Sequence, residues 1–307
     1  MVILITEFMD EQAVARLRQQ FKVVHKPDAF AQPEQLVDEL ANADALIVRN
    51  QTKVTESLLH LAPRLKLVGR LGVGLDNINL EACKARGIKV IPATGANAHS
   101  VAEYVVVSAV ALLRRLPAAM QGMQAKGWCR AESSDGREAP GRKLGIVGLG
   151  DIGCRVARLA QSFGFECTGH DPFLKQAPTN IELLSFEDLL QTADVISIHV
   201  PYLASTASMF NAKVIASMKP GSILINTSRG GIVDEQALLK ALTSGQLGGA
   251  AIDVFETEPL PAPTELARLA NVIVTPHISG VTQDSNQRVS GLIAERVANE
   301  LHQLSKG

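Results

Sequence analysis

The sequence predicts an α/β protein made of two doubly wound parallel-sheet domains. Short apolar runs alternate with amphipathic helical stretches over most of the chain, which is the pattern of parallel strands joined by helices. A glycine-rich unit of strand, turn and helix, which normally opens such a domain, comes only at Gly148, so residues 1–97 must form a domain of their own. With 307 residues, the chain is long enough for two hydrophobic cores.

The first domain is expected to hold a parallel, flavodoxin-like sheet with helices on its faces. A final helix over about 286–304 follows the last strand of the second domain and is expected to cross back to the first. We therefore predict that residues 1–97 and 282–307 form one domain and that residues 98–281 form the other. The two connections between them would form a hinge, with an interdomain cleft. In the first domain the predicted strands are 2–6, 21–24, 45–48, 65–68 and 88–91, and the helices are 11–20, 33–43, 56–61 and 80–86.

The second domain begins with a helical segment, 98–128, that is too apolar for an exposed linker. We expect it to pack between domains or against a second subunit, as the dimerisation helix of a homodimer. A polar loop over 129–142 follows, and Asp234 is expected to cap a helix over 235–242. Strands beyond the glycine-rich unit are predicted at 195–200, 223–226, 250–254 and 272–275.

Residues 143–171 read as a dinucleotide-binding unit. Gly148 allows a tight turn after an apolar strand, Gly150 leaves room for a pyrophosphate, and Gly153 lets the following helix sit close to the sheet. The helix N-terminus offers free N–H groups and a positive dipole end to that anion. Asp171 ends the next strand, where a carboxylate can bind an adenosine ribose, and its charge would repel a 2′-phosphate. The unit therefore predicts NAD rather than NADP.

The composition of the chain argues against nucleic acid, membrane and metal ions as binding partners. The formal net charge is −1 and aromatic residues make up 4% of the chain, which argues against nucleic-acid binding. No stretch approaches the roughly 20 apolar residues that span a bilayer, and the first twelve residues resemble a strand rather than a signal peptide. The cysteines form no C-x-x-C pair, so we expect no metal site, reduced thiols and a cytoplasmic protein; they are Cys83, Cys129, Cys154 and Cys167.

Polar side chains follow three predicted strands of the second domain. Arg229 comes shortly after the strand at 223–226, and His277 follows the strand at 272–275. Asp253 lies at the end of the strand at 250–254, and Glu258 comes five residues after Asp253. Taken singly, each could be a surface salt bridge, a solvated loop residue or a turn residue. Because ligands bind beyond the carboxyl ends of parallel strands, their joint placement beside a dinucleotide unit favours a catalytic role.

The chain resembles the D-isomer-specific 2-hydroxyacid dehydrogenases over nearly its whole length. The resemblance implies NAD-dependent hydride transfer between a small 2-hydroxy acid and its 2-keto acid, with 1–97 and 282–307 binding the substrate and 98–281 forming a Rossmann domain. It also implies that Arg229, Glu258 and His277 are the catalytic set. The motifs that carry it are RLGVGLDNI (70–78), GANAHSVAEY (95–104), GLGDIG (148–153), HVPYLASTASMFN (199–211), MKPGSILINTSRGGIVDEQAL (218–238), AAIDVFETEPL (250–260) and TPHISG (275–280).

The resemblance and general chemistry imply the same roles. An imidazole can give or take a proton near neutral pH, which suits His277, and Glu258 would orient its ring. Arg229 would hold the substrate carboxylate with its fork of donors. The family also implies substrate contacts from the backbone of Val73 and Gly74, from Ser100 and from Arg49. For NAD it implies Gly148, Gly150, Asp151, Ile152, Gly153, Asp171, His199, Val200, Pro201, Thr206, Thr227, Ser228, Arg229, Asp253, His277, Gly280 and Val101.

The identity of the acid depends on finer resemblances. Arg49 matches a phosphate-binding arginine of the phosphoglycerate dehydrogenases, which favours a substrate with a second anionic group. Asn50 and Pro92-Ala93-Thr94 depart from that subgroup, and EFMD (7–10) with HISGVTQDSNQRVS (277–290) looks more like the sulfolactate dehydrogenases of the same family. Sulfolactate is therefore favoured over phosphoglycerate, hydroxypyruvate and glyoxylate. A corepressor-like protein that senses NAD without turnover is the alternative from another class. Formate dehydrogenases of the same superfamily carry Gln where this chain has Glu258, so we do not expect this chain to oxidise formate.

Overall fold

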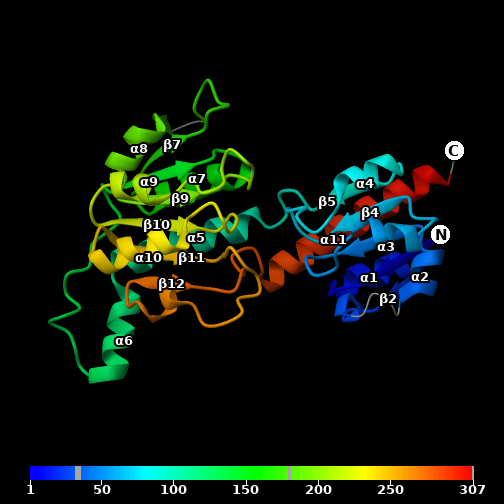
Figure 1. The fold of residues 1–307 in the computed structure, drawn as a ribbon, viewed down its shortest axis with the longest axis horizontal. Helices are drawn as coiled ribbons and strands as arrows, with labels where there is room; N and C mark the ends of the chain where they lie inside the picture. The colour runs from blue at the N-terminus through cyan, green and yellow to red at the C-terminus, as the bar shows by residue number, and fades with distance from the viewer. Residues whose placement is uncertain (32–35, 179–180, 306–307) are drawn as a thin grey trace. The chain divides into compact units, whose positions relative to one another are not determined.

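The computed structural model describes residues 1–31, 36–178 and 181–305. The chain divides into two compact units. Unit 1 consists of Met1–Asn97 together with Val281–Gly307, and unit 2 consists of Ala98–Gly280. Each unit is built on one parallel β-sheet with helices packed on it, so the predicted α/β class with two parallel sheets is confirmed (Figure 1). Over the described residues, no helix is both long and apolar enough to cross a bilayer.

Unit 1 contains a five-stranded parallel sheet in the order β2-β1-β3-β4-β5. The C-terminal helix α11 (Gln283–Leu304) belongs to this unit and packs directly on the sheet: a Cβ on Gly69 of β4 would lie 2.9 Å from Val297. The elements are β1 (Val2–Ile5), α1 (Glu11–Arg18), β2 (Lys22–His25), the 3-10 helix η1 (Ala29–Ala31), α2 (Val37–Asn42), β3 (Ala45–Val48), α3 (Glu56–Leu61), β4 (Leu67–Arg70), α4 (Leu80–Ala85) and β5 (Lys89–Pro92).

Most predicted elements of unit 1 are found within a few residues of their predicted bounds. The helix predicted over 33–43 is observed as α2, and its first part at 33–35 lies outside the described residues. Caps fix several of the starts, because an exposed helix end needs acceptors for its free N–H groups. The side chain of Asp10 accepts from Gln12 and Ala13 at the start of α1, and that of Thr55 accepts from Leu58 at the start of α3.

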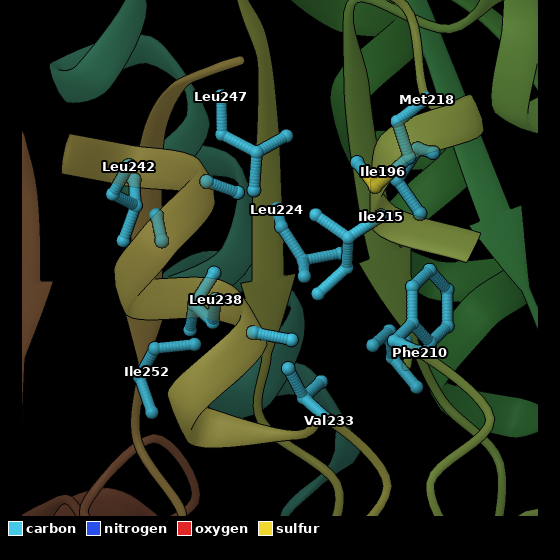
Figure 2. Close-up of a cluster of buried hydrophobic side chains, with 14 of the residues drawn as sticks. Ile196, Phe210, Ile215, Met218, Leu224, Val233, Leu238, Leu242, Leu247 and Ile252 are labelled. Carbon is cyan, nitrogen blue, oxygen red and sulfur yellow. The ribbon is translucent and has the colours of Figure 1, made fainter. Parts of the chain in front are cut away.

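Unit 2 contains a seven-stranded parallel sheet in the order β12-β11-β10-β9-β6-β7-β8. Figure 2 shows one side of its core, where Leu238 and Leu242 of α10 face Leu224 and Ile252 of the sheet. The elements are α5 (Ala98–Leu113), α6 (Leu116–Lys126), β6 (Lys143–Val147), α7 (Asp151–Ser162), β7 (Glu166–His170), β8 (Glu182–Leu183), α8 (Phe186–Thr192), β9 (Val195–Ile198), α9 (Ala212–Ser217), β10 (Ser222–Asn226), α10 (Glu235–Ser244), β11 (Leu247–Ile252), the 3-10 helix η3 (Glu265–Arg268) and β12 (Val272–Val274).

The apolar segment predicted as one helical stretch over 98–128 forms two helices. Arg115 adopts a left-handed conformation with φ +54°, and this turn ends α5. The new helix α6 begins directly after it, with Pro117 in its first turn. Ten residues of α5 are buried, whereas no residue of α6 is, and α6 extends away from the sheet (Figure 1). The predicted cap of α10 is confirmed, since Asp234 accepts a hydrogen bond from the Ala237 N–H. The short elements β8, α8 and α9 were not predicted.

Candidate active site

The glycine-rich turn between β6 and α7 needs each glycine for a different reason. Gly148 has φ +95°, and a Cβ there would lie 2.6 Å from the carbonyl oxygen of His199. A Cβ on Gly153 would lie 2.1 Å from the carbonyl oxygen of Gly148, so α7 can approach the strand only through a glycine. A Cβ on Gly150 would have no described atom within 4 Å, so the backbone at this position is open to a ligand.

Asp171 lies directly against this turn, at the end of β7. One oxygen of its carboxylate accepts from the Leu149 N–H at 3.0 Å and the other from the Phe173 N–H at 3.0 Å. The strand pairing puts Val147 opposite His170, which brings the acid to the glycine-rich turn 22 residues earlier in the chain. A fixed carboxylate at this point suits a ribose diol and disfavours a 2′-phosphate.

Two further groups line the same edge of the sheet. The ring of His199 lies 2.8 Å from the Ser197 hydroxyl, and burial lowers the pKa of His199 to about 3, so this imidazole is neutral at physiological pH. The Thr227 hydroxyl is buried after β10 and has no hydrogen-bond partner among the described residues. A buried polar atom left unpaired at a strand end fits a ligand such as the dinucleotide.

The predicted catalytic residues follow three neighbouring strands. Asn226, Ile252 and Val274 end β10, β11 and β12 and lie opposite one another in the register. Beyond them, His277 Nδ1 lies 2.7 Å from Glu258 Oε2, while Glu258 Oε1 accepts from the Phe255 N–H at 2.9 Å. A carboxylate only accepts, so Nδ1 carries a proton and the Nε2 atom of the neutral ring is left as a proton acceptor.

The loop of Arg229 is in backbone contact with the loop of Glu258. A Cβ on Gly230 would lie only 1.8 Å from the carbonyl oxygen of Phe255, the residue whose N–H holds Glu258. The Arg229 guanidinium donates to the Ser228 carbonyl at 2.6 Å, and the Asn226 side chain donates to the Arg229 carbonyl at 3.0 Å. The structure therefore joins the Arg229 loop, the Glu258 loop and His277 through a chain of direct contacts.

Asp253 holds the turn that carries His277. Its fully buried carboxylate accepts from the Thr275 hydroxyl at 2.5 Å and from the N–H groups of Ile278 and Ser279 at 2.8 Å each. These three bonds bracket His277, which has φ +55°, a conformation that costs a residue with a side chain about 1 kcal/mol or more. Asp253 was predicted to contact the cofactor, and the structure shows it as the anchor of the turn that carries His277.

One member of this network was missed by sequence reasoning. The Tyr104 hydroxyl on α5 lies 2.6 Å from Thr275 Oγ1, and because Thr275 donates to Asp253, Tyr104 must be the donor. Burial raises the pKa of Tyr104, and its hydrogen bond to Thr275 opposes that shift, so the phenol keeps its proton. Nothing in the local pattern of α5 distinguishes Tyr104 from an ordinary buried aromatic residue.

The remaining predicted residues lie in several environments. Ser100 and Val101 are each 4% exposed on α5, and Val101 packs in the core of unit 2. The Thr206 hydroxyl closes its own turn, donating to the Pro201 carbonyl at 2.6 Å and accepting from the Leu203 N–H at 2.8 Å. The other positions on the NAD side fall in unit 2, at Asp151, Ile152, Val200, Ser228 and Gly280, and the substrate positions Arg49, Val73 and Gly74 fall in unit 1.

A glycine-rich βα turn with an acid at the next strand end, beside a histidine–carboxylate pair, defines a nicotinamide-dependent oxidoreductase. The family model described as "D-isomer specific 2-hydroxyacid dehydrogenase, NAD binding domain" matches residues 106–279. The chain belongs to this family and its cofactor is NAD. Among the described residues, no group of three or more His, Cys, Asp and Glu side chains could hold a metal ion.

Similar proteins fall in the same family. The (S)-sulfolactate dehydrogenase of Chromohalobacter salexigens is 44% identical over 305 residues, covering 97% of this chain and 98% of that one. The D-3-phosphoglycerate dehydrogenase of Mycobacterium tuberculosis H37Rv is 40% identical over 301 residues, but the match covers only 56% of its length. The crystal structure of D-lactate dehydrogenase from Aquifex aeolicus, complexed with NAD and lactic acid, has a TM-score of 0.86 and 31% identity, and the match covers 99% of this chain and 96% of that one.

Proposed function

We propose that this enzyme interconverts a small D-2-hydroxy acid and its 2-keto acid, and that the preferred pair is sulfolactate and sulfopyruvate. The observation that carries the chemistry is the pairing of His277 with Glu258 beside the Arg229 loop. NAD supplies the hydride acceptor, or NADH the donor, for carbon 2 of the substrate. The residues of the chain bind the acid and move the proton.

His277 is the proposed proton donor and acceptor for the substrate's 2-oxygen. Its Nδ1–H is held by Glu258, so Nε2 is the atom that exchanges the proton, and the carboxylate stabilises the imidazolium that forms on oxidation of the hydroxy acid. Arg229 is the proposed partner of the substrate carboxylate, because a guanidinium offers parallel donors to two oxygens. The backbone of Val73 and Gly74, together with Ser100, completes the proposed substrate contacts.

A second anionic group on the substrate is proposed to bind Arg49. This half-buried guanidinium donates to the neutral amide oxygen of Asn286 at 2.9 Å and lies 5.9 Å from the centre of the Phe8 ring, and no described carboxylate forms an ion pair with it. Burial lowers the pKa of Arg49, as expected of a cation without a direct counterion, although the nearby Glu7 opposes this. An anion from the substrate would supply the missing partner.

A sulfonate on carbon 3 fits this proposal. It is a tetrahedral anion like phosphate with one charge fewer. A sulfolactate dehydrogenase is among the relatives of this chain, and the match covers 97% of this chain and 98% of that protein. The name (S) of that relative agrees with a D-specific family, because sulfur on carbon 3 changes the naming priority without changing the spatial arrangement. Phosphoglycerate is the second candidate, on the 40% identity to phosphoglycerate dehydrogenases.

The substrate proposal is tested by measuring NADH oxidation with sulfopyruvate, phosphohydroxypyruvate, hydroxypyruvate and glyoxylate. We expect the highest kcat/KM with sulfopyruvate. A preference for hydroxypyruvate or glyoxylate, which carry no second anionic group, would contradict the role of Arg49. His277→Ala should lower kcat by roughly a hundredfold or more while NADH binding is retained. An unchanged rate would contradict the proton-transfer role of His277.

A homodimer is part of the same proposal, supported by the exposed face of α6. Met120 and Met123 on this helix and Trp128 after it are exposed, Trp128 to 82%, and apolar groups this exposed commonly mark an interface. We expect the parent enzyme to sediment as a dimer and the Trp128→Glu variant to sediment as a monomer. The control variant Phe163→Glu, at the end of α7, should remain a dimer. A cytoplasmic location is also proposed, because all four cysteines are free thiols.

A further inference from the structure

Glu7 is a buried acid that the catalytic proposal does not use. It follows β1 and is only 3% exposed, which is unusual for a carboxylate. Its two oxygens accept hydrogen bonds from four consecutive backbone N–H groups in the loop after β3. Oε1 accepts from Arg49 at 2.8 Å and Thr52 at 2.9 Å, and Oε2 accepts from Asn50 at 3.1 Å and Gln51 at 3.0 Å.

The carbonyl side of the same loop is held as firmly. The Asn77 side chain donates to the Arg49 carbonyl at 3.2 Å and to the Thr52 carbonyl at 2.7 Å. The Thr52 hydroxyl lies 2.8 Å from the Thr6 hydroxyl, and both side chains are buried. With its N–H groups bound by Glu7, the loop presents no free backbone donor at these four positions, so an incoming anion meets the Arg49 side chain and not a nest of N–H groups.

The guanidinium itself is held at its far end. It donates to Asn286 in the first turn of α11 and lies against Phe8, the neighbour of Glu7. Residues 7 and 8 therefore contact both ends of Arg49, one through its backbone N–H and the other through its side chain. A long side chain fixed in this way loses little conformational freedom when it binds a ligand.

We infer that Glu7 is a positioning residue for substrate specificity, which fixes the 49–52 loop so that Arg49 is directed to the anionic group on carbon 3 of the substrate. This inference rests on the proposed function, because it takes Arg49 as the partner of that group. Glu7 does not contact the substrate in this account. It acts through Arg49, so its loss should affect acids with a charged carbon-3 group more than acids without one.

The test compares the KM of sulfopyruvate with that of hydroxypyruvate, whose carbon 3 carries an uncharged hydroxyl. Glu7→Gln keeps the shape of the side chain but replaces one acceptor oxygen with a donor, which faces two backbone N–H groups. We expect it to raise the KM of sulfopyruvate about tenfold more than that of hydroxypyruvate, which corresponds to about 1.4 kcal/mol. Glu7→Asp keeps the charge but is one methylene shorter, and should give a smaller change of the same kind. Glu56→Gln, an exposed acid on α3, is the matched control and should leave the ratio of KM values unchanged.

Combining the change with Arg49→Ala separates the possible outcomes. If Glu7 acts through Arg49, the double variant should show no larger change in the KM ratio than Arg49→Ala alone. A purely structural role for Glu7 would lower kcat/KM for both substrates equally and lower the Tm, with an unchanged ratio, and that result would overturn the inference. If Arg49→Ala leaves the ratio unchanged, or no 2-keto acid is reduced, the proposed function fails and the inference fails with it. A change in the ratio for Arg49→Ala but not for Glu7→Gln or Glu7→Asp would overturn only the inference.

Discussion

His277 and Glu258 share a 2.7 Å hydrogen bond although they are 19 positions apart and follow different strands. The second oxygen of the carboxylate is held by the Phe255 N–H, so Glu258 cannot turn away from the ring without losing a second bond. One tautomer of His277 is therefore favoured, with its proton on Nδ1. This relationship is the basis for the proposed proton transfer.

Replacing Glu258 with Gln should lower kcat by roughly ten- to a hundredfold, because the amide neither stabilises an imidazolium nor fixes the ring tautomer as a carboxylate does. Stopped-flow measurement of NADH oxidation with a 2-keto acid gives the rate, and NADH fluorescence should show unchanged cofactor affinity. The exposed Glu256, two residues earlier in the same loop, provides the matched control Glu256→Gln. A rate equal to that of the parent enzyme would remove Glu258 from the mechanism.

The hydroxyl of Thr275 should help to hold the turn that carries His277. Thr275→Val removes the hydrogen bond to Asp253 and the hydrogen bond from Tyr104. The buried carboxylate of Asp253 then has one hydrogen-bond donor fewer. We expect kcat to fall by roughly tenfold and the free energy of unfolding to fall by about 1–3 kcal/mol, measured by urea titration. Thr275→Ser keeps the hydroxyl and should retain most of both quantities. Equal behaviour of the two variants would show that the hydroxyl does not hold the turn.

Gly230 is expected to tolerate no side chain. The Ala Cβ would lie 1.8 Å from a backbone carbonyl, so the Arg229 and Glu258 loops must separate, and the 2-keto acid should be reduced at least tenfold more slowly. Gly221→Ala is the comparison, since Gly221 has φ +74° with no described atom near its Cβ position and should cost only about 1 kcal/mol of stability with normal kcat. If Gly230→Ala retains full activity, the two loops need not be in contact for catalysis.

Asp194 should make stability depend on pH at the acidic end. Burial alone would raise its pKa, but hydrogen bonds from Lys219 at 2.9 Å and from the Lys143 N–H at 3.0 Å, with the charges of Lys219 and Arg142, hold the pKa of Asp194 below its ordinary 3.8. A lowered pKa in the folded state means that the ionised carboxylate stabilises the fold above the ordinary value and ceases to do so as the pH falls through the folded value.

Asp194→Asn should accordingly reduce the free energy of unfolding by about 1–3 kcal/mol at neutral pH. The gap between variant and parent should narrow as the pH falls below about 4, because the parent then loses the same charge. Chemical unfolding at several pH values measures both quantities. A gap that is constant with pH would show that the charge of Asp194 does not contribute.

Much of the fold was predictable because its signals are local. The ranges 45–48 and 56–61 were predicted with the bounds that the structure gives to β3 and α3, and the cap at Asp234 follows from residue chemistry alone. The prediction over 98–128 was wrong as a single helical stretch, because the turn at Arg115 depends on a backbone conformation that apolar periodicity does not reveal. The two-residue strand β8 is too short to leave a periodic pattern.

The sequence by itself determined the alternation of strands and helices, the three glycines of the turn and the identities of the polar residues at the strand ends. These depend on side-chain spacing and on glycine's conformational freedom, which act over a few residues. Only the tertiary structure decided that Glu7 binds the loop at 49–52, that Tyr104 donates to Thr275, and that Gly230 touches Phe255. These contacts join positions 25 to 171 residues apart. They exist because the order and register of the strands within each sheet bring distant segments of the chain together, which no local pattern specifies.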